Sequence, residues 1–421
     1  MRQHLSLLAV ILLASLTPAA TVEFTVSAGK HKRTNEPVRV PLLLSNSVPP
    51  GAQVTVKDST GKQLAVGQLT QPDLVTESIE GARGKQRLDL HFILPQLDAG
   101  KALALKADID ENPGKAATDA FAFENGSSDR EKWIELRQGE RPVWRFMHTP
   151  WSGPAKDTGN PTSKVYHHVF DPAAGKQLLT NGAEGKFPHH RGVFYGFSKT
   201  TYGKNTVDIW HCRGDVHQSL AKVESAIAGP VLGRHLLNVD WIGVGKKPFA
   251  HERRELTAYA VPGGTLLEFV SKLTPTGESV RVDGDPQHAG FQFRAAQEVE
   301  AKTEKQTIYI RPDGVDKPGA TRNWDGKKHT DHVNLPWLAM SFVVGGQRYT
   351  TAYLDRPENP KEARFSERAY GRFGSYFVAT ATREKPLVVR YRLWIQPGQM
   401  TPAQVAQKSH AWVEPVEVRV K

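Results

Sequence analysis

Hydrophobic and polar residues alternate with a period of two along most of this chain. Runs such as RLDLHFIL (87–94), TLLEFVSKLTP (265–275) and LVVRYRLWIQP (387–397) place their apolar side chains on one side, as half-buried strands do. Gly-Gly pairs at 263–264 and 345–346 separate neighbouring runs, where a hairpin turn needs a positive φ. The pattern predicts an all-β protein built from antiparallel hairpins.

The composition changes near ENGSSDREKW (124–133), a polar stretch without periodicity that we interpret as a linker. The residues before it have the pattern of six or seven short strands, enough for a small β-sandwich. All nine tryptophans and most of the histidines lie from this stretch onward. We expect an N-terminal β-sandwich over 21–128 and a large antiparallel β domain over 129–421. Thr401-Pro402 predicts a short C-terminal helix, because this pair combines an N-cap residue with a first-turn proline.

The first 20 residues have the pattern of a cleaved signal peptide. Arg2 lies in a short polar head, an apolar run extends from Leu5 to Leu16, and small residues stand at Ala19 and Ala20. A run of this length is shorter than the roughly 20 residues that span a bilayer, and charge, Gly or Pro interrupts every later apolar stretch. We therefore expect a periplasmic or secreted protein, with no membrane span in the mature chain.

The formal charge is +11, and the basic residues are dispersed rather than gathered in runs. This distribution does not indicate a nucleic-acid-binding surface. It is compatible with a role in solubility or with an acidic glycan as partner. The single cysteine, Cys212, excludes an internal disulfide. The sequence has no Gly-x-Ser-x-Gly elbow for a serine nucleophile and no phosphate-binding glycine loop.

The stretch KFPHHRGVFYGF (186–197) holds the densest group of reactive side chains. Imidazole transfers protons near neutral pH, and a guanidinium can hold an anionic or hydroxyl-rich group. Strand alternation predicts His189, Arg191 and Tyr195 on one face and His190 on the other. This arrangement would combine a proton-transfer group, a fixed cation and an aromatic ring.

A second candidate wall lies in DGDPQHAGFQFRA (283–295). Alternation places His288, Gln292 and Arg294 on one face, and Gly290 between them leaves room for a ligand against the backbone. The segments RFMHTPW and VDIWHCRGDVHQ add His148, Trp210 and His211. Aromatic faces stack on the apolar side of a pyranose while polar side chains bind its hydroxyls, so this set predicts a sugar site.

A metal site is the opposing interpretation. No segment has the tight spacing of a structural zinc site, and the His-x-x-His pair at 329–332 is a weak signal. We expect no cofactor. The alternative is a divalent metal ion held by histidines that converge in space, from the set His148, His189, His190, His211 and His288.

Five blocks in order, FPHHRGVFYGF, DIWHCRG, HAGFQFRA, YLDRPENP with RAYGRFGSYF, and VVRYRLWIQPG, resemble the signature of a bacterial family labelled PmoA-like. The resemblance covers about residues 140–415. The label implies a subunit of a membrane copper oxygenase, which is a bundle of apolar spanning helices, and we interpret it as a misnomer for this β-rich chain. Arg368 and Tyr370 match the family's Arg-x-Tyr-Gly, whereas PENPKEARFSERAYG lacks the histidine and tryptophan expected in the preceding loop.

The fold is also similar by analogy to the galactose-mutarotase-like β-supersandwich, in which two histidines and a carboxylate act on sugar oxygens. The analogy implies His190 or His189 as the first catalytic histidine, His288 as the second, and Arg191 as a substrate clamp. The carboxylate would be one of four residues, Asp208, Asp285, Asp355 or Glu358.

The hypothesis is therefore an exported carbohydrate-active enzyme, either a hydrolase, a lyase or an epimerase. The alternatives are a non-catalytic glycan-binding protein and a metal-dependent enzyme. The expected catalytic residues are His190, His288 and His189. The expected substrate-binding residues are Arg191, Tyr195, His148, Trp210, His211, Gln292, Arg368 and Tyr370.

Overall fold

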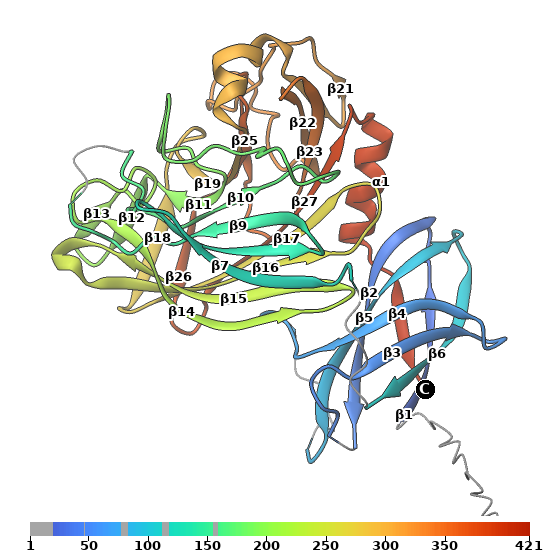
Figure 1. Cartoon of the computed structure of the whole chain (residues 1–421). Coiled ribbons are helices and arrows are strands. Elements are labelled where there is room, and N and C mark those ends of the chain that lie inside the picture. Colours follow the sequence, from blue (N-terminus) through green and yellow to red (C-terminus); the bar gives the residue numbers. More distant parts are fainter. Residues whose placement is uncertain (1–19, 46, 77–82, 112–117, 155–158) are drawn as a thin grey trace, which may run out of the picture.

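The structure, a computed structural model, describes residues 20–45, 47–76, 83–111, 118–154 and 159–421. The predicted signal peptide over residues 1–20 lies, except for Ala20, outside the described residues. The described chain forms antiparallel sheets and one α-helix near its C-terminus (Figure 1), which confirms the all-β prediction. Within these ranges no helix is long and apolar enough to cross a membrane.

The N-terminal part forms one seven-stranded sheet that curls until its two edge strands contact each other. Burial alternates as the sequence predicts: Val38, Val40 and Leu42 are buried, and Arg39 and Pro41 between them are exposed. In sheet order the strands are β2 (Arg33–Leu44), β5 (Gln86–Leu97), β4 (Gln63–Thr70), β3 (Gln53–Asp58), β6 (Ala102–Asp110), β1 (Ala20–Ser27) and β28 (Glu417–Val420). The last strand comes from the other end of the chain.

The polar stretch 124–133 is not a linker. Strand β7 (Phe121–Ser127) pairs with β8 (Lys132–Gln138), so most of the stretch belongs to a hairpin in the second part of the molecule. Its polarity has a structural cause, because β7 is an edge strand with mostly exposed side chains. The division into two domains at 128 stays a prediction. In the structure, the change from one sheet to the next falls between Asp110 and Phe121.

The larger part is built from an eight-stranded, a nine-stranded and a four-stranded sheet. The eight-stranded sheet runs β24 (Arg364–Arg368), β25 (Arg372–Tyr376), β19 (Ala289–Arg294), β11 (Val193–Phe197), β10 (Tyr166–Val169), β9 (Arg141–Met147), β8 and β7. The nine-stranded sheet runs β14 (His217–Ala228), β15 (Leu232–Ile242), β16 (Pro248–Tyr259), β17 (Thr265–Pro275), β27 (Leu387–Pro397), β23 (Gln347–Leu354), β22 (Trp337–Val344), β20 (Ile308–Arg311) and β21 (Gly314–Val315). The four-stranded sheet runs β13 (Asn205–Val207), β12 (Lys199–Tyr202), β18 (Ser279–Asp283) and β26 (Ala379–Thr382).

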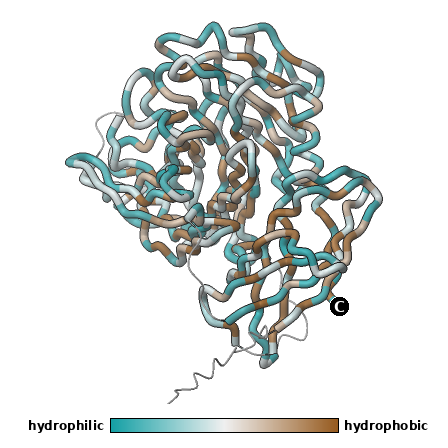
Figure 2. The backbone as a smooth tube through the Cα atoms, turned by 45° about the vertical axis from the view of Figure 1, so that its right-hand side comes forward, coloured by the Kyte–Doolittle hydropathy of each residue, from teal (hydrophilic) through white to brown (hydrophobic). Residues whose placement is uncertain are grey.

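The two largest sheets pack face to face over one hydrophobic core. Phe291 of β19 stacks on Phe269 of β17 and on Tyr391 of β27, with ring centroids 4.4 and 4.7 Å apart. Tyr195 of β11 lies 5.9 Å from Trp241 of β15 in the same core. Hydrophobic positions of the chain gather toward the middle of the larger part in the hydropathy view (Figure 2). One face of the eight-stranded sheet is thus covered, and its other face carries the polar cluster described below.

Helix α1 (Pro402–Val413) confirms the helix predicted from Thr401-Pro402. The Thr401 side chain accepts a hydrogen bond from the Gln404 backbone N–H, and the Gln404 side chain accepts one from the Thr401 backbone, which is a complete capping box. Val405 and Trp412 face a small core shared with the nine-stranded sheet. The remaining helical segments are the short turns η1 (Val244–Lys246), η2 (Val299–Thr303) and η3 (Glu304–Gln306).

Candidate active site

His189 and His190 lie in a tight turn rather than at the start of a strand. The His190 backbone N–H donates to the Phe187 carbonyl over 2.9 Å, and β11 begins only at Val193. Phe187 has φ 58° and Gly192 has φ 43°, so the chain does not follow a regular pleat here. The expectation that the two imidazoles face opposite ways is therefore wrong. Their rings are neighbours, with centroids 4.2 Å apart.

Four imidazoles from three separate segments meet over the outer face of the eight-stranded sheet. The ring of His288 lies 5.7 Å from His189 and 5.8 Å from His190. His211, from the loop after β13, lies 4.6 Å from His189 and 4.8 Å from His288. The structure thus brings His189 and His190 together with His288, and His211 joins them.

Two of these histidines are oriented by carboxylates three residues earlier in the chain. Asp208 Oδ2 lies 2.7 Å from His211 Nδ1, and both Asp285 oxygens lie 3.1 Å from His288 Nδ1. Burial alone would raise the pKa of each Asp, but the hydrogen bond from its histidine leaves the pKa of Asp208 and of Asp285 lowered. The repeated Asp-x-x-His spacing, DIWH and DPQH, is the sequence signal that would have paired these groups.

The cluster is open to solvent on one side. The side chains of His211 and His288 are 17% and 26% exposed, and those of Asp208 and Asp285 are 40% and 52% exposed. The Nε2 atom of His189 is buried, and burial together with nearby Lys164 lowers the pKa of His189 to about 2. A ligand could therefore reach the carboxylate-bound imidazoles first.

Aromatic rings border His190. Its ring is nearly parallel to that of Tyr370, and the Tyr370 hydroxyl lies 3.3 Å from His190 Nδ1. Trp210 contacts His190 edge-on at 5.6 Å and rests on Phe194 of β11. Phe187 packs against Tyr370 at 4.9 Å. Burial lowers the pKa of His190 well below its usual value, and nearby Arg372 lowers it further.

Buried cations bind the backbone that carries the cluster. Lys164 is one of them, and the sequence analysis did not identify it. Its ammonium donates to the carbonyls of His189, over 3.0 Å, and of Trp210, and it lies 4.3 Å from the Phe194 ring centroid. Burial lowers the pKa of Lys164 to about 7. A lone lysine in TSKVYHH carries no motif, so its role appears only once the two loops are brought together.

Two predicted substrate-binding residues instead hold the framework. Arg191 is buried, and its guanidinium donates to the carbonyls of Pro188 and Asn160 over 2.8 and 2.9 Å. Gln292 donates to the Ala289 carbonyl and accepts from Arg372 over 3.0 Å. Arg191 therefore holds the turn in place, and Gln292 positions Arg372. Direct contact of either side chain with a substrate stays a prediction.

Other predicted residues are not brought to the cluster. Tyr195 faces the opposite side of its strand and is buried in the core between the sheets, because the pleat reverses the side-chain direction after Phe194. His148 stacks on Phe146 at 5.7 Å. Asp355 is paired with Lys361 and Asn359, and Glu358 lies near Arg356 in the same loop. Burial lowers the pKa of Arg368, and its neighbour Tyr370 offsets part of that lowering.

The glycines in these strands serve backbone packing rather than ligand access. A Cβ at Gly290 would overlap the Ser375 carbonyl of β25, and one at Gly192 would overlap the His167 carbonyl of β10. At Gly196 it would press on the Phe194 ring and the Ile209 carbonyl. The expectation that Gly290 leaves room for a ligand is therefore wrong, because neighbouring backbone already occupies that space.

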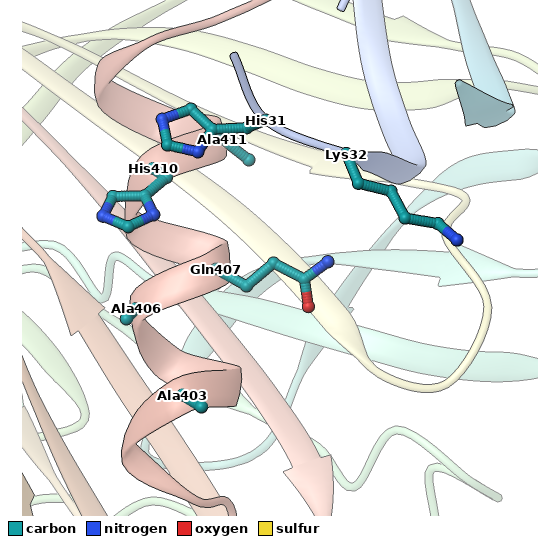
Figure 3. Close-up of a pocket in the computed structure, with 7 residues that line it drawn as sticks. All are labelled: His31, Lys32, Ala403, Ala406, Gln407, His410 and Ala411. Carbon is teal, nitrogen blue, oxygen red and sulfur yellow. The ribbon is translucent and has the colours of Figure 1, made fainter. Parts of the chain in front are cut away.

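A separate cavity of about 360 Å³ lies between α1 and the N-terminal sheet (Figure 3). His31 and His410 stack across it at 4.5 Å, and Glu414 accepts from His31 over 3.1 Å. Gln407 and three alanines, at positions 403, 406 and 411, form the rest of its helical wall. This cavity holds fewer convergent polar groups than the histidine cluster on the outer sheet face.

The fold and the site together define an all-β protein of large antiparallel sheets with a histidine-rich site on one sheet face. The chain belongs to DUF6807, a family of unknown function whose profile matches residues 133–410. The matched range contains all four clustered histidines. No curated protein matches the chain.

Among solved structures, the chain is similar to a protein in the glycosyl hydrolase family 38 from Enterococcus faecalis. The TM-score is 0.38 at 10% identity, and the match covers 96% of this chain and 48% of that one. The chain thus spans about half the length of that protein. At this TM-score the likeness assigns neither a fold family nor an activity to the chain.

Proposed function

We propose that this chain is an exported carbohydrate-active enzyme that acts by acid–base chemistry on a sugar ring or a glycosidic bond. The observation that carries the proposal is the cluster of four imidazoles with two carboxylates and the rings of Trp210 and Tyr370 on one sheet face. Groups of this kind are needed to move protons on sugar oxygens and to hold a pyranose by its apolar face.

Each part of the cluster has a chemical use. An imidazole whose Nδ1 donates to a carboxylate has a fixed tautomer and a fixed ring orientation, which is what a proton-transfer group needs. Asp208 with His211 and Asp285 with His288 are two such pairs, and their rings lie 4.8 Å apart. One sugar oxygen between them would lie within hydrogen-bond reach of both.

The remaining parts of the proposal are expectations from the sequence. The resemblance to the galactose-mutarotase-like fold supports a sugar as the substrate, and the first 20 residues support export to the periplasm or medium. Whether the reaction is hydrolysis, elimination or epimerisation depends on the substrate. The net charge of +11 favours testing acidic polysaccharides early.

The test is a substrate screen on the purified chain. Neutral oligosaccharides and acidic polysaccharides are incubated with it and assayed for new reducing ends, unsaturated products and changed anomer or epimer ratios. His288→Gln should abolish any activity found. His217→Gln is the control, because His217 is a histidine that stacks on Trp151 instead of joining the cluster.

Two outcomes would contradict the proposal. If no carbohydrate is converted, although one binds with the same affinity to wild type and His288→Gln, the chain is a glycan-binding protein. If activity appears and survives His288→Gln at the level of the His217→Gln control, the chemistry lies elsewhere on the molecule.

A further inference from the structure

We infer that His189, His211 and His288 bind one divalent transition metal ion, with Zn²⁺ as the representative, and leave a coordination position open for water or a substrate oxygen. One imidazole nitrogen from each residue lies within 4.8 Å of those from the other two. The ion would bind the nitrogens of His211 and His288 that the proposed function uses for proton transfer, so with the ion bound the acid–base role falls to His190 beside them. Metal binding itself does not depend on which substrate the protein takes.

The hydrogen bonds of the cluster decide which nitrogens are free to bind a metal ion. A carboxylate only accepts, so Asp208 and Asp285 require a proton on Nδ1 of His211 and of His288. In the neutral rings, Nε2 then carries a lone pair. His189 Nε2 is buried and has no hydrogen-bond partner among the described residues.

The three imidazoles thus bring their free nitrogens within 4.8 Å of one another, and among the described residues none donates a hydrogen bond to His189 Nε2. Protonation of the three rings would place positive charges opposite one another. If the rings stay neutral, a buried nitrogen without a hydrogen-bond partner lowers stability by about 1–3 kcal/mol. A metal cation satisfies all three nitrogens at once. This is the arrangement of metal-binding histidines, whose other ring N–H ordinarily donates to a carboxylate or a backbone carbonyl.

The donor set indicates the class of metal. Imidazole suits zinc, copper, iron and nickel, and three protein ligands with a free fourth position are typical of catalytic zinc. Zn–N bonds of about 2.0–2.1 Å place the nitrogens about 3.4 Å apart in a tetrahedron. The three rings must therefore close in slightly, and all three lie in loops or turns outside the regular strands.

The surrounding charges are compatible with a cation. Asp208 and Asp285 lie directly behind two of the ligands. The ammonium of Lys164 donates to the carbonyls of His189 and Trp210, and Arg372 lies toward His190. His190 is not one of the three ligands, and its Nδ1 faces the Tyr370 hydroxyl.

The experiment measures metal binding by the full chain without any sugar. Protein stripped with a chelator is titrated with Zn²⁺ by calorimetry and with Co²⁺ by visible absorption, which reports nitrogen coordination and geometry. We expect one site per chain. His211→Gln, His288→Gln and His189→Gln should each weaken it by more than about 100-fold, beyond the 10–100-fold typical of losing a group that orients a ligand. Asp285→Asn should fall within that smaller range.

His410→Gln is the control for binding elsewhere, because His31 and His410 form the other stacked histidine pair near a carboxylate. Zn²⁺ binding that is lost in His410→Gln and kept in the cluster variants would overturn the inference, as would the absence of tight binding to the folded wild-type chain. Circular dichroism of each variant checks folding. A chain that binds Zn²⁺ as expected but converts no carbohydrate would retain the metal site and defeat only the proposed function.

Discussion

Replacing Gly192 by alanine should destabilise the protein far more than the same change at an equally left-handed but open glycine. Gly192 follows the histidine turn with φ 43°, and a Cβ there would come well under 3.0 Å from the His167 carbonyl oxygen. Its own backbone N–H and carbonyl bond to Asn181 and to Arg294 over 2.9 and 2.8 Å. The backbone therefore cannot move aside without breaking the link between the turn and β19.

The expected cost has two parts. A left-handed conformation costs an L-residue about 1–2 kcal/mol, and forcing extra atoms into a packed site costs about 1–3 kcal/mol. The total for Gly192→Ala is about 2–5 kcal/mol. Gly203, in the turn between β12 and β13, has φ 53° and nothing within 4 Å of a built Cβ, so Gly203→Ala should lose only the first part.

Urea unfolding of the full chain, followed by tryptophan fluorescence, compares the two variants. Gly192→Ala should also weaken Zn²⁺ binding, because the turn that carries His189 must shift although no ligand is changed. Equal destabilisation by the two substitutions would refute the reasoning that backbone contact fixes this turn.

Three further predictions concern the rest of the chain. Burial raises the pKa of Glu255 to about 7. Its contribution to stability is therefore complete below about pH 4.5 and is lost as the pH rises toward 7. The urea midpoint of the wild-type chain should fall over this pH window, and Glu255→Gln should make that fall smaller. The charged groups around Glu255 are Arg234, Asp73 and Glu268. Removing residues 414–421 takes away β28, the partner of β1, and should speed proteolysis of the N-terminal sheet; an unchanged cleavage rate would show that β28 is dispensable. Lys164→Met leaves two loop carbonyls without their donor and should lower the free energy of unfolding by about 2–4 kcal/mol. The same change at the exposed Lys222 should lower it by almost nothing. Equal effects would contradict the supporting role assigned to Lys164.

The fold class was predictable because burial in a two-layer β protein repeats every second residue. Val38, Val40 and Leu42 show this directly, and the capping box at Thr401 is equally local. The hairpin at 121–138 was not predictable from the same rule. Its edge strand faces solvent on most positions, so its composition resembles that of a linker.

The site was predictable only in part. Its histidines stand out in the sequence, but alternation assigned His189 and His190 to opposite faces because it assumed a strand where Phe187 and Gly192 bend the chain. The pairing of His211 with Asp208 is local and could be found from the Asp-x-x-His spacing. The support from Lys164 joins loops 25 and 46 residues away, which no local pattern encodes.

The most direct test of the central claim is the effect of His190→Gln on turnover of whichever carbohydrate the screen identifies, measured together with the affinity for that carbohydrate. General acid–base groups contribute about 10²–10⁴-fold to rate. If the cluster is the active site, His190→Gln should lower kcat by at least about 100-fold while the chain stays folded and still binds the sugar. A variant that turns over as fast as His217→Gln would contradict the claim.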